Sequence, residues 1–399
     1  MNTPYTILNP HVSDFWARPL AFVLVKRKPL KKYGYLISVP VSRGEKVNML
    51  VNGAHSGLIP DKVFKILPGI LRFLWLRVEI KLWLKSNDLK GKVNIYYSPE
   101  KIKDKQALVF VCFRNHAFPK ALQKSCRHFK ISIGHLSHYF QTPAEYSSAV
   151  KDIPNFYLAS DVDVSANSFF QKYFSWYTKP IVLLPFAVSD RFVIKKEFEK
   201  RQAKAVATGT FHMIEHDASA HYYAALRKFA NANTVHPLRR KIFEKKEEIK
   251  KWIDCYCYPY FESNVKKKKF LDYVLPKKLR VQQATYFSFD IVDKYNDYKY
   301  AIVGEEFYNG LPGIGAFEAM ACGTVLIGHP DCYKGTGLIE GEHFLPHHND
   351  LHEIINTIEL ANQQKDRIKT ISQRAASFVK EKYNPVNLTE EFTRSISSL

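Results

Sequence analysis

The sequence predicts an α/β protein of two domains, and three observations carry this prediction. The chain has 399 residues, a length typical of two domains that each bury a core. From residue 92 onward, short apolar runs rich in β-branched residues alternate with helical patterns. Residues 299–328 combine an apolar run, a glycine-rich loop, a short helical pattern and a second apolar run, which is typical of one right-handed α/β unit.

The opening of the chain contains four apolar runs that we interpret as short strands, at residues 5–8, 22–25, 35–39 and 47–51. The first of these runs follow one another too closely for helices to lie between them, so we expect no regular βαβ array here. Residues 52–57 are typical of a flexible glycine turn, which either only reverses the chain or contacts a substrate.

Residues 61–86 are expected to be helical after Pro68 and to combine basic and aromatic side chains. Arg77, Lys81 and Lys85 recur at every fourth position and therefore share one helix face. Three aromatic residues add bulk to this segment: Phe73, Trp75 and Trp83. Such a helix suits the headgroup layer of an anionic membrane. It is equally explained as a buried helix whose lysine and arginine stems cover apolar surface.

The α/β alternation then becomes regular. We expect strands at residues 93–97, 107–111 and 130–135, and a helix at residues 119–129. The third strand ends in His135, whose neutral imidazole is suited to hydrogen-bond a ligand. The alternative is a histidine that only ends a strand; His116 and His138 are weaker candidates.

An Asp-x-Asp pattern at Asp161 and Asp163 follows the strand predicted at residues 156–160. Such a pattern can bind a divalent cation, but here Asp163 and Ser165 are more typical of a helix N-cap. We therefore expect no metal site and no cofactor. A helix is predicted from residue 165 to 176.

The second half of the chain is expected to open with a strand and glycine turn at residues 205–211, after a charged linker. A basic cluster at residues 236–241 is either a phosphate-binding group, with arginines forming bidentate contacts, or a solvated helix start. Further helices are predicted at residues 244–252, 351–360 and 366–383, with a last one from Leu388.

The glycine-rich loop before the helix of residues 310–323 (GLPGIGAFEAMACG) is the strongest candidate site. Gly310, Gly313 and Gly315 allow a ligand to approach the backbone closely, and the N–H groups of a first helical turn favour a phosphate. Glu318 is placed to accept hydrogen bonds from two ribose hydroxyls. Alternatively, the small residues only let helix and sheet pack, and Glu318 is a solvated charge.

Residues 318–324 (EAMACGT), with the apolar run after them, resemble the nucleotide-sugar signature of GT-B glycosyltransferases, especially family 4. The resemblance is clear over the last hundred residues or so. Family 4 usually carries a second glutamate eight positions before Glu318, where this chain has Gly310; Glu305 and Glu306 lie a few residues upstream. The arginine and lysine that clamp the donor diphosphate in the family are also missing after the turn at residues 205–211.

The resemblance implies a GT-B fold: two Rossmann-like α/β domains that face a central cleft, with a last helix that crosses back to the first domain. The expected domains are residues 1–190 for the acceptor and 200–383 for the donor, with residues 384–399 as the returning helix. The resemblance implies His135 and Glu318 as catalytic residues, and we expect Glu306 to substitute for the glutamate that is missing at position 310. The expected donor-binding residues are Thr208, Gly209, Thr210, Arg239, Arg240, Gly313, Ile314, Gly315, Ala316 and Glu318.

The implied activity is retaining, metal-independent transfer of a sugar from a nucleotide-sugar donor to a glycan or lipid-linked acceptor. The expected setting is the assembly of a bacterial surface polysaccharide such as lipopolysaccharide. Two alternatives stay open: a transferase that uses a nucleoside-monophosphate sugar, which would explain the missing clamp, and a catalytically silent binding module, which the absent glutamate at Gly310 favours.

The charge of the chain is unusual, with 59 Lys and Arg against 38 Asp and Glu, a formal net charge of +21. Such a field attracts polyanions, and without a nucleic-acid-binding motif we expect an anionic membrane surface rather than a nucleic acid. No signal peptide or bilayer-spanning run is recognised, and the six cysteines are scattered. We therefore expect a cytoplasmic protein with reduced thiols, peripheral at the inner face of the cytoplasmic membrane.

Overall fold

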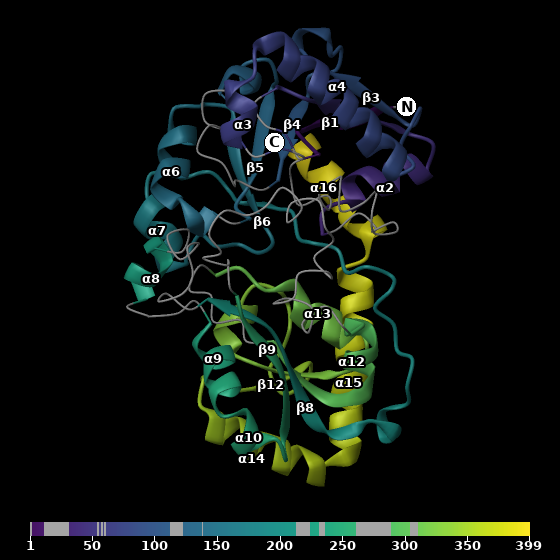
Figure 1. Ribbon diagram of the computed structural model, residues 1–399, viewed down its shortest axis with the longest axis vertical. Coiled ribbons are helices and arrows are strands. Elements are labelled where there is room, and N and C mark those ends of the chain that lie inside the picture. Colours follow the sequence, from purple (N-terminus) through teal and green to yellow (C-terminus); the bar gives the residue numbers. More distant parts are fainter. Residues whose placement is uncertain are drawn as a thin grey trace.

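The computed structural model contains two parallel sheets stacked along the long axis of the molecule (Figure 1). It describes residues 2–11, 32–53, 56, 59, 61–111, 123–137, 139–212, 224–230, 236–260, 289–303 and 310–399. The sequence-predicted α/β class is confirmed. The predicted strand at residues 22–25 and the first four residues of the predicted helix at residues 119–129 lie outside the described residues. Of the rest of that helix, residues 123–126 are helical and residues 127–129 form a turn.

The N-terminal sheet has seven strands in the order β3-β2-β1-β4-β5-β6-β7, and every neighbouring pair is parallel. Its strands are β1 (Asn2–Leu8), β2 (Lys46–Leu50), β3 (Val93–Tyr96), β4 (Ala107–Phe110), β5 (Ile131–His135), β6 (Phe156–Ser160) and β7 (Val182–Leu183). The central strands β4 and β5 are buried along their whole length, which explains why they appear in the sequence as continuous apolar runs.

The C-terminal sheet has five parallel strands in the order β12-β11-β10-β8-β9. They are β8 (Gln202–His212), β9 (Ile253–Tyr260), β10 (Tyr298–Ile302), β11 (Val325–Gly328) and β12 (Phe344–Pro346). The predicted unit of residues 299–328 is β10, α13 and β11, so this part of the prediction is confirmed in type and order.

Thirteen helices of the described chain surround the sheets. They are α2 (Tyr35–Ser42), α3 (Asp61–Ile66), α4 (Gly69–Ser86), α6 (Pro143–Lys151), α7 (Ser168–Phe174), α8 (Ala224–Ala230), α9 (Pro237–Glu244), α10 (Lys246–Ile249), α12 (Ile291–Asp297), α13 (Ile314–Ala321), α14 (Leu351–Gln363), α15 (Lys365–Lys382) and α16 (Pro385–Ser398). None of them, within the ranges described, is both long and apolar enough to cross a bilayer.

The prediction of a strand at residues 35–39 is wrong, because these residues form helix α2. Parallel neighbours such as β1 and β2 need a crossover connection, and α2 lies within it. The β-branched residues of α2 are accommodated by burial, and tyrosine hydroxyls fix the helix: Tyr5 donates to the carbonyl of Leu36 at 2.8 Å, and Tyr35 to that of Pro185 at 2.7 Å. Tertiary packing therefore overrides the local strand preference.

The last helix returns to the N-terminal sheet, as predicted for the fold. The yellow helix α16 lies beside α2 in Figure 1. Phe392 packs on Tyr5 of β1 with ring centroids 5.8 Å apart, and Arg43 pairs with Glu390 at 2.5 Å. Residues from both sheets contribute to the largest hydrophobic core, so the two halves share buried surface.

Candidate active site between the two sheets

The carboxyl edges of the two sheets face each other. Gly310, in the segment after β10, has φ +73°, and a Cβ there would lie 2.8 Å from the Asn167 side chain, which follows β6. Phe317 of α13 packs on Phe186, which follows β7, with ring centroids 5.0 Å apart. Figure 1 shows α13 at the side of the C-terminal sheet nearest the other sheet. Open parallel sheets bind ligands at this edge, so the site is built from both halves.

Helix α13 begins at this edge with Gly313 as its N-cap residue, and no side chain caps it in the described structure. The first N–H groups of a helix have no partner within the helix and favour an anion. Gly315 packs closely on the end of β10: a Cβ there would meet Val303 Cγ1 at 3.0 Å. Close packing therefore explains Gly315, whereas Gly313, Ile314 and Glu318 are partly exposed.

The end of β8 lies beside this helix start. Thr208 is buried, and its hydroxyl lies 3.3 Å from the hydroxyl of Tyr295, which is itself 3.7 Å from the position of a Cβ on Gly315. Gly209 has φ +129°, and a Cβ there would lie 2.6 Å from Cζ of Arg239. Glycine at position 209 is therefore required both by its backbone conformation and by the guanidinium packed against it.

Arg239 of α9 spans the ends of β8 and β10. Its Nε donates to the carbonyl of Val303 at 2.7 Å, its Nη1 donates to that of Thr210 at 2.9 Å, and its Nη2 also donates to Val303. The side chain is buried, so a positive charge is held close to the strand ends. The N–H groups of Arg239 were expected to bind phosphate, but in the structure they donate to backbone carbonyls at the ends of β8 and β10.

The structure brings Thr208, Gly209, Thr210, Arg239 and Gly315 together. Arg240 makes a different contact, since its Nε donates to Glu244 at 2.7 Å one turn along α9. The remaining predicted donor residues, Gly313, Ile314, Ala316 and Glu318, all lie at or on α13. Glu306 lies outside the described residues, as do Glu305, His116 and His138.

His135 ends β5 on the facing edge and is fully buried. The N–H of Ser137 donates to its Nδ1 at 2.9 Å, so Nε2 carries the hydrogen of the neutral ring and donates to the carbonyl of Leu184 at 2.9 Å. Both ring nitrogens therefore have partners within the protein. A contact of His135 with the donor sugar stays a prediction, and it requires one of these bonds to be exchanged.

Asp161 is a buried carboxylate behind His135 that the sequence reasoning treated only as part of an Asp-x-Asp pattern. Its Oδ1 accepts from the Tyr33 hydroxyl and the Phe186 N–H, both at 2.9 Å, and lies 3.9 Å from His135 Nε2. Burial raises the pKa of Asp161, although His135 and these donors act in the opposite direction. Asp163 accepts from the N–H of Ser165 at 2.9 Å in a local turn, while the N-cap of α7 is Asn167.

No group of three or more His, Cys, Asp and Glu side chains within the described ranges is arranged to hold a metal ion. The five cysteines described there are free thiols: Cys126, Cys255, Cys257, Cys322 and Cys332.

Arg201 holds the other end of α13 and was missed from the sequence. It is buried just before β8, and its Nη2 donates to the carbonyl of Cys322 at 2.8 Å while its Nη1 donates to the hydroxyl of Thr324 at 3.2 Å. Gly323 (φ +72°) ends the helix beside it. Its position in a charged linker gave no signal of this role, because the two partners at the end of α13, Cys322 and Thr324, are more than a hundred residues away in the chain.

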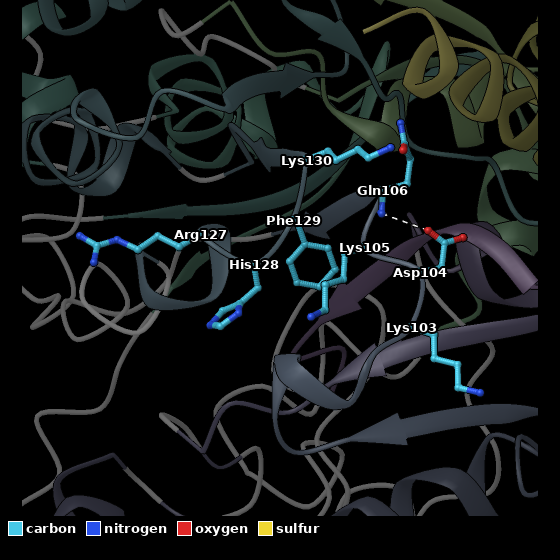
Figure 2. Close-up of a pocket in the computed structure, with 8 residues that line it drawn as sticks. All are labelled: Lys103, Asp104, Lys105, Gln106, Arg127, His128, Phe129 and Lys130. Carbon is cyan, nitrogen blue, oxygen red and sulfur yellow. Dashed lines mark hydrogen bonds between the residues drawn. The ribbon is translucent and has the colours of Figure 1, made fainter.

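A basic hollow of about 460 Å³ lies elsewhere on the N-terminal sheet (Figure 2). Its cations are Lys103, Lys105, Arg127 and Lys130. These residues come just before β4 and β5 or in the turn leading to β5, so they lie at the amino edge of the sheet. The hollow is therefore separate from the site at the carboxyl edges.

Comparison with solved structures identifies this arrangement of two facing sheets. The structure of Anabaena HepE in complex with UDP and glucose aligns over 100% of both chains with a TM-score of 0.52 and 8% sequence identity. Sucrose-phosphate synthase from Thermosynechococcus elongatus aligns over 98% of both chains (TM-score 0.54, 10% identity). A glycosyltransferase from Rickettsia africae also aligns over 98% of both chains (TM-score 0.53, 12% identity).

The chain has the GT-B fold. At this identity the likeness establishes the fold alone, and neither a family model nor a curated protein matches the sequence. In the GT-B fold the carboxyl edges of the two sheets face each other. Helix α13 and the ends of β8 and β10 lie at this edge of the C-terminal sheet, and His135 and Asp161 lie at the ends of β5 and β6, at the corresponding edge of the N-terminal sheet.

Proposed function

We propose that this GT-B protein transfers a sugar from a nucleotide-sugar donor to a glycan or lipid-linked acceptor. The observation that carries the proposal is the start of α13: an N-cap glycine without a side-chain cap, next to the ends of β8 and β10, at the edge facing the other sheet. The similar structure of HepE, which contains UDP and glucose, supports a donor of this class.

The donor phosphates are proposed to lie at the first turn of α13, near Gly313 and Ile314. The N–H groups there, together with the buried charge of Arg239, would stabilise negative charge on the departing phosphate. Glu318, one turn further along the helix and partly exposed, would accept hydrogen bonds from ribose hydroxyls. Thr208, Gly209 and Thr210 would form the floor of this site at the end of β8.

His135 and Glu306 are proposed to act on the transferring sugar from opposite sides of the cleft. Asp161 and Tyr33 would position the His135 ring, since Tyr33 packs on it with centroids 4.6 Å apart and donates to the Asp161 carboxylate. Closure of the cleft would exclude water and so favour transfer over hydrolysis of the donor.

The finer features of the proposed reaction come from the resemblance of residues 318–324 to family 4. They are retention of the anomeric configuration, independence of a metal ion, and a role in assembling a bacterial surface polysaccharide. The protein would work at the cytoplasmic side of the membrane that presents a lipid-linked acceptor.

A silent binding module is the second candidate, and one observation favours it. The family glutamate would occupy position 310, where Gly310 has a positive φ and no room for a side chain beside Asn167. If Glu306 does not supply the missing carboxylate, the protein would bind a donor without transferring its sugar.

Thermal-shift measurements against nucleotides and nucleotide sugars test the proposal. A ligand present at about 100 times its Kd stabilises the folded state by close to 3 kcal/mol, which is easily measured. A shift with at least one uridine, guanosine, adenosine or cytidine sugar is expected. Absence of any shift would contradict donor binding, and binding without transfer to any acceptor would favour the silent module.

A further inference from the structure

Helices α3 and α4 expose an unusual amount of apolar surface. Of the fifteen large apolar side chains exposed in the part of the chain that the structure describes, eight belong to these two helices. They are Val63, Ile66, Ile70, Leu71, Phe73, Leu74, Val78 and Leu82. Such a concentration on one surface element marks an interaction site rather than ordinary surface scatter.

On α4 the exposed apolar residues form a stripe. Leu71, Leu74, Val78 and Leu82 follow one another at spacings of three or four residues, so they lie along one side of the helix, and each is 41–53% exposed. The opposite side is directed into the protein and buries Leu76, Glu79, Ile80 and Trp83. The stripe therefore points away from the core and is not part of it.

The two tryptophans of α4 have a different role from the one expected at a membrane surface. Trp83 is fully buried, and Trp75 donates from Nε1 to the Glu79 carboxylate at 3.1 Å. Glu79 is itself fully buried and also accepts from the Ser56 hydroxyl at 2.6 Å. The aliphatic stripe, rather than the tryptophans, is what this helix offers to a partner.

The charges next to the stripe are positive. Arg77, Lys81 and Lys85 form a second row at intervals of four residues, and Lys65 is exposed on α3. The only acidic residue of α4, Glu79, is buried. A second copy of this face would bring like charges together, whereas an anionic lipid surface would match both the apolar row and the cations.

A pocket of about 350 Å³ opens beside the start of α4, after the ends of β2 and β3. It is lined by Asn52, Gly53, Arg72, Phe73 and Tyr97, among others. The Nε of Arg72 is buried without a hydrogen-bond partner in the described structure. A buried donor of this kind needs a ligand or water, and a guanidinium is suited to bind a phosphate.

We propose that the α3–α4 face docks on an anionic bilayer and that the adjoining pocket takes the phosphate of a lipid-borne acceptor through Arg72. The stripe enters the headgroup layer, and the cationic row contacts lipid phosphates. The pocket then lies at headgroup level and at the carboxyl edge of the N-terminal sheet, on the side of the cleft away from the proposed donor site. This inference deepens the proposed function and rests on it for the identity of the acceptor.

Binding of the full chain to vesicles tests the docking surface, with phosphatidylcholine vesicles that contain or lack phosphatidylglycerol. Wild-type protein should bind the anionic vesicles and dissociate as salt rises. Lys81→Gln with Lys85→Gln should weaken binding about 30-fold at low salt, since each lysine near the surface contributes about 1 kcal/mol. Leu74→Glu with Val78→Glu should abolish it.

Matched controls lie on the other half of the molecule. Leu360 on α14 is 56% exposed, and Lys365 is exposed at the start of α15, so Leu360→Glu with Lys365→Gln should leave vesicle binding unchanged. Equal binding of the α4 variants and the wild type would overturn the docking surface. A wild-type dimer that becomes monomeric in the Leu74→Glu, Val78→Glu variant would also overturn the docking surface, because the α3–α4 face would then bind a second copy of the chain.

Arg72→Gln tests the pocket in neutral vesicles that contain either farnesyl phosphate or farnesol. Wild-type protein should bind the phosphate-containing vesicles at least tenfold more tightly, and Arg72→Gln should remove that preference while its binding to phosphatidylglycerol vesicles remains. Equal preference in both proteins would overturn the assignment. Thermal shifts with nucleotide sugars are measured in parallel: if these persist while vesicle binding is absent, the inference fails and the proposed function stands.

Discussion

Replacing Gly209 by alanine tests the most constrained contact of the donor site. Gly209 has φ +129°, and the new Cβ would lie 2.6 Å from both Cζ and Nε of Arg239. The guanidinium would have to leave the carbonyls of Val303 and Thr210. Loss of a hydrogen bond that involves a charged group costs about 1.5–3 kcal/mol, and the left-handed backbone adds about 1–2 kcal/mol. We expect a loss of about 3–5 kcal/mol in the free energy of unfolding.

Gly91→Ala is the matched control, because Gly91 has φ +79° and no atom within 4 Å of the added Cβ. It should show only the backbone cost, about 1–2 kcal/mol. Urea unfolding of both variants and the wild type gives the comparison. If the two variants lose equal stability, the close packing of Gly209 on Arg239 contributes nothing beyond the backbone conformation, and the prediction is wrong.

Three further predictions concern the same cleft and its surroundings. Glu318→Gln should weaken nucleotide binding by about 1.5–3 kcal/mol in a folded protein, measured by calorimetry, because a charge-assisted bond to the ribose is lost; unchanged affinity would remove the ribose assignment. His135→Ala should lower single-turnover transfer about 100-fold or more while nucleotide affinity barely changes; normal transfer would exclude His135 from catalysis. Burial lowers the pKa of His347 to about 4, so the unfolded chain binds a proton more readily than the folded chain between pH 6.5 and 4. The free energy of unfolding should therefore decrease as the pH is lowered from 6.5 to 4. His347→Asn should flatten this dependence by up to about 3 kcal/mol; an unchanged thermal-denaturation profile would contradict it.

The elements that could be predicted from sequence are those whose local pattern agrees with their tertiary setting. The unit of β10, α13 and β11 was located because glycines, small residues and a buried strand follow one another there. Residues 35–39 were mistaken for a strand because their β-branched composition is local, whereas the parallel crossover that makes them a helix depends on the pairing of β1 with β2.

The candidate site shows the same division. Glycine positions 209 and 315 were identified from the pattern, but their closest neighbours, Arg239 and Val303, come from other elements. The burial of His135, and its approach to Asp161 and Tyr33, arise only when three segments far apart in the chain meet. Likewise, the sequence placed cations and aromatic residues on one helix but did not show that Trp83 is buried while Leu74 and Val78 are exposed.

Isothermal titration of a nucleotide sugar into wild-type protein and Gly313→Asp tests the central claim most directly. Gly313 has φ −87° and ψ 131°, an ordinary N-cap conformation that aspartate adopts readily. The new carboxylate would accept hydrogen bonds from the N–H groups that are proposed to bind the donor phosphates. Its negative charge would also repel those phosphates. We predict unchanged or slightly higher thermal stability together with at least about tenfold weaker binding, equal to 1.4 kcal/mol or more. Equal affinity in the two proteins would contradict a donor site at the start of α13.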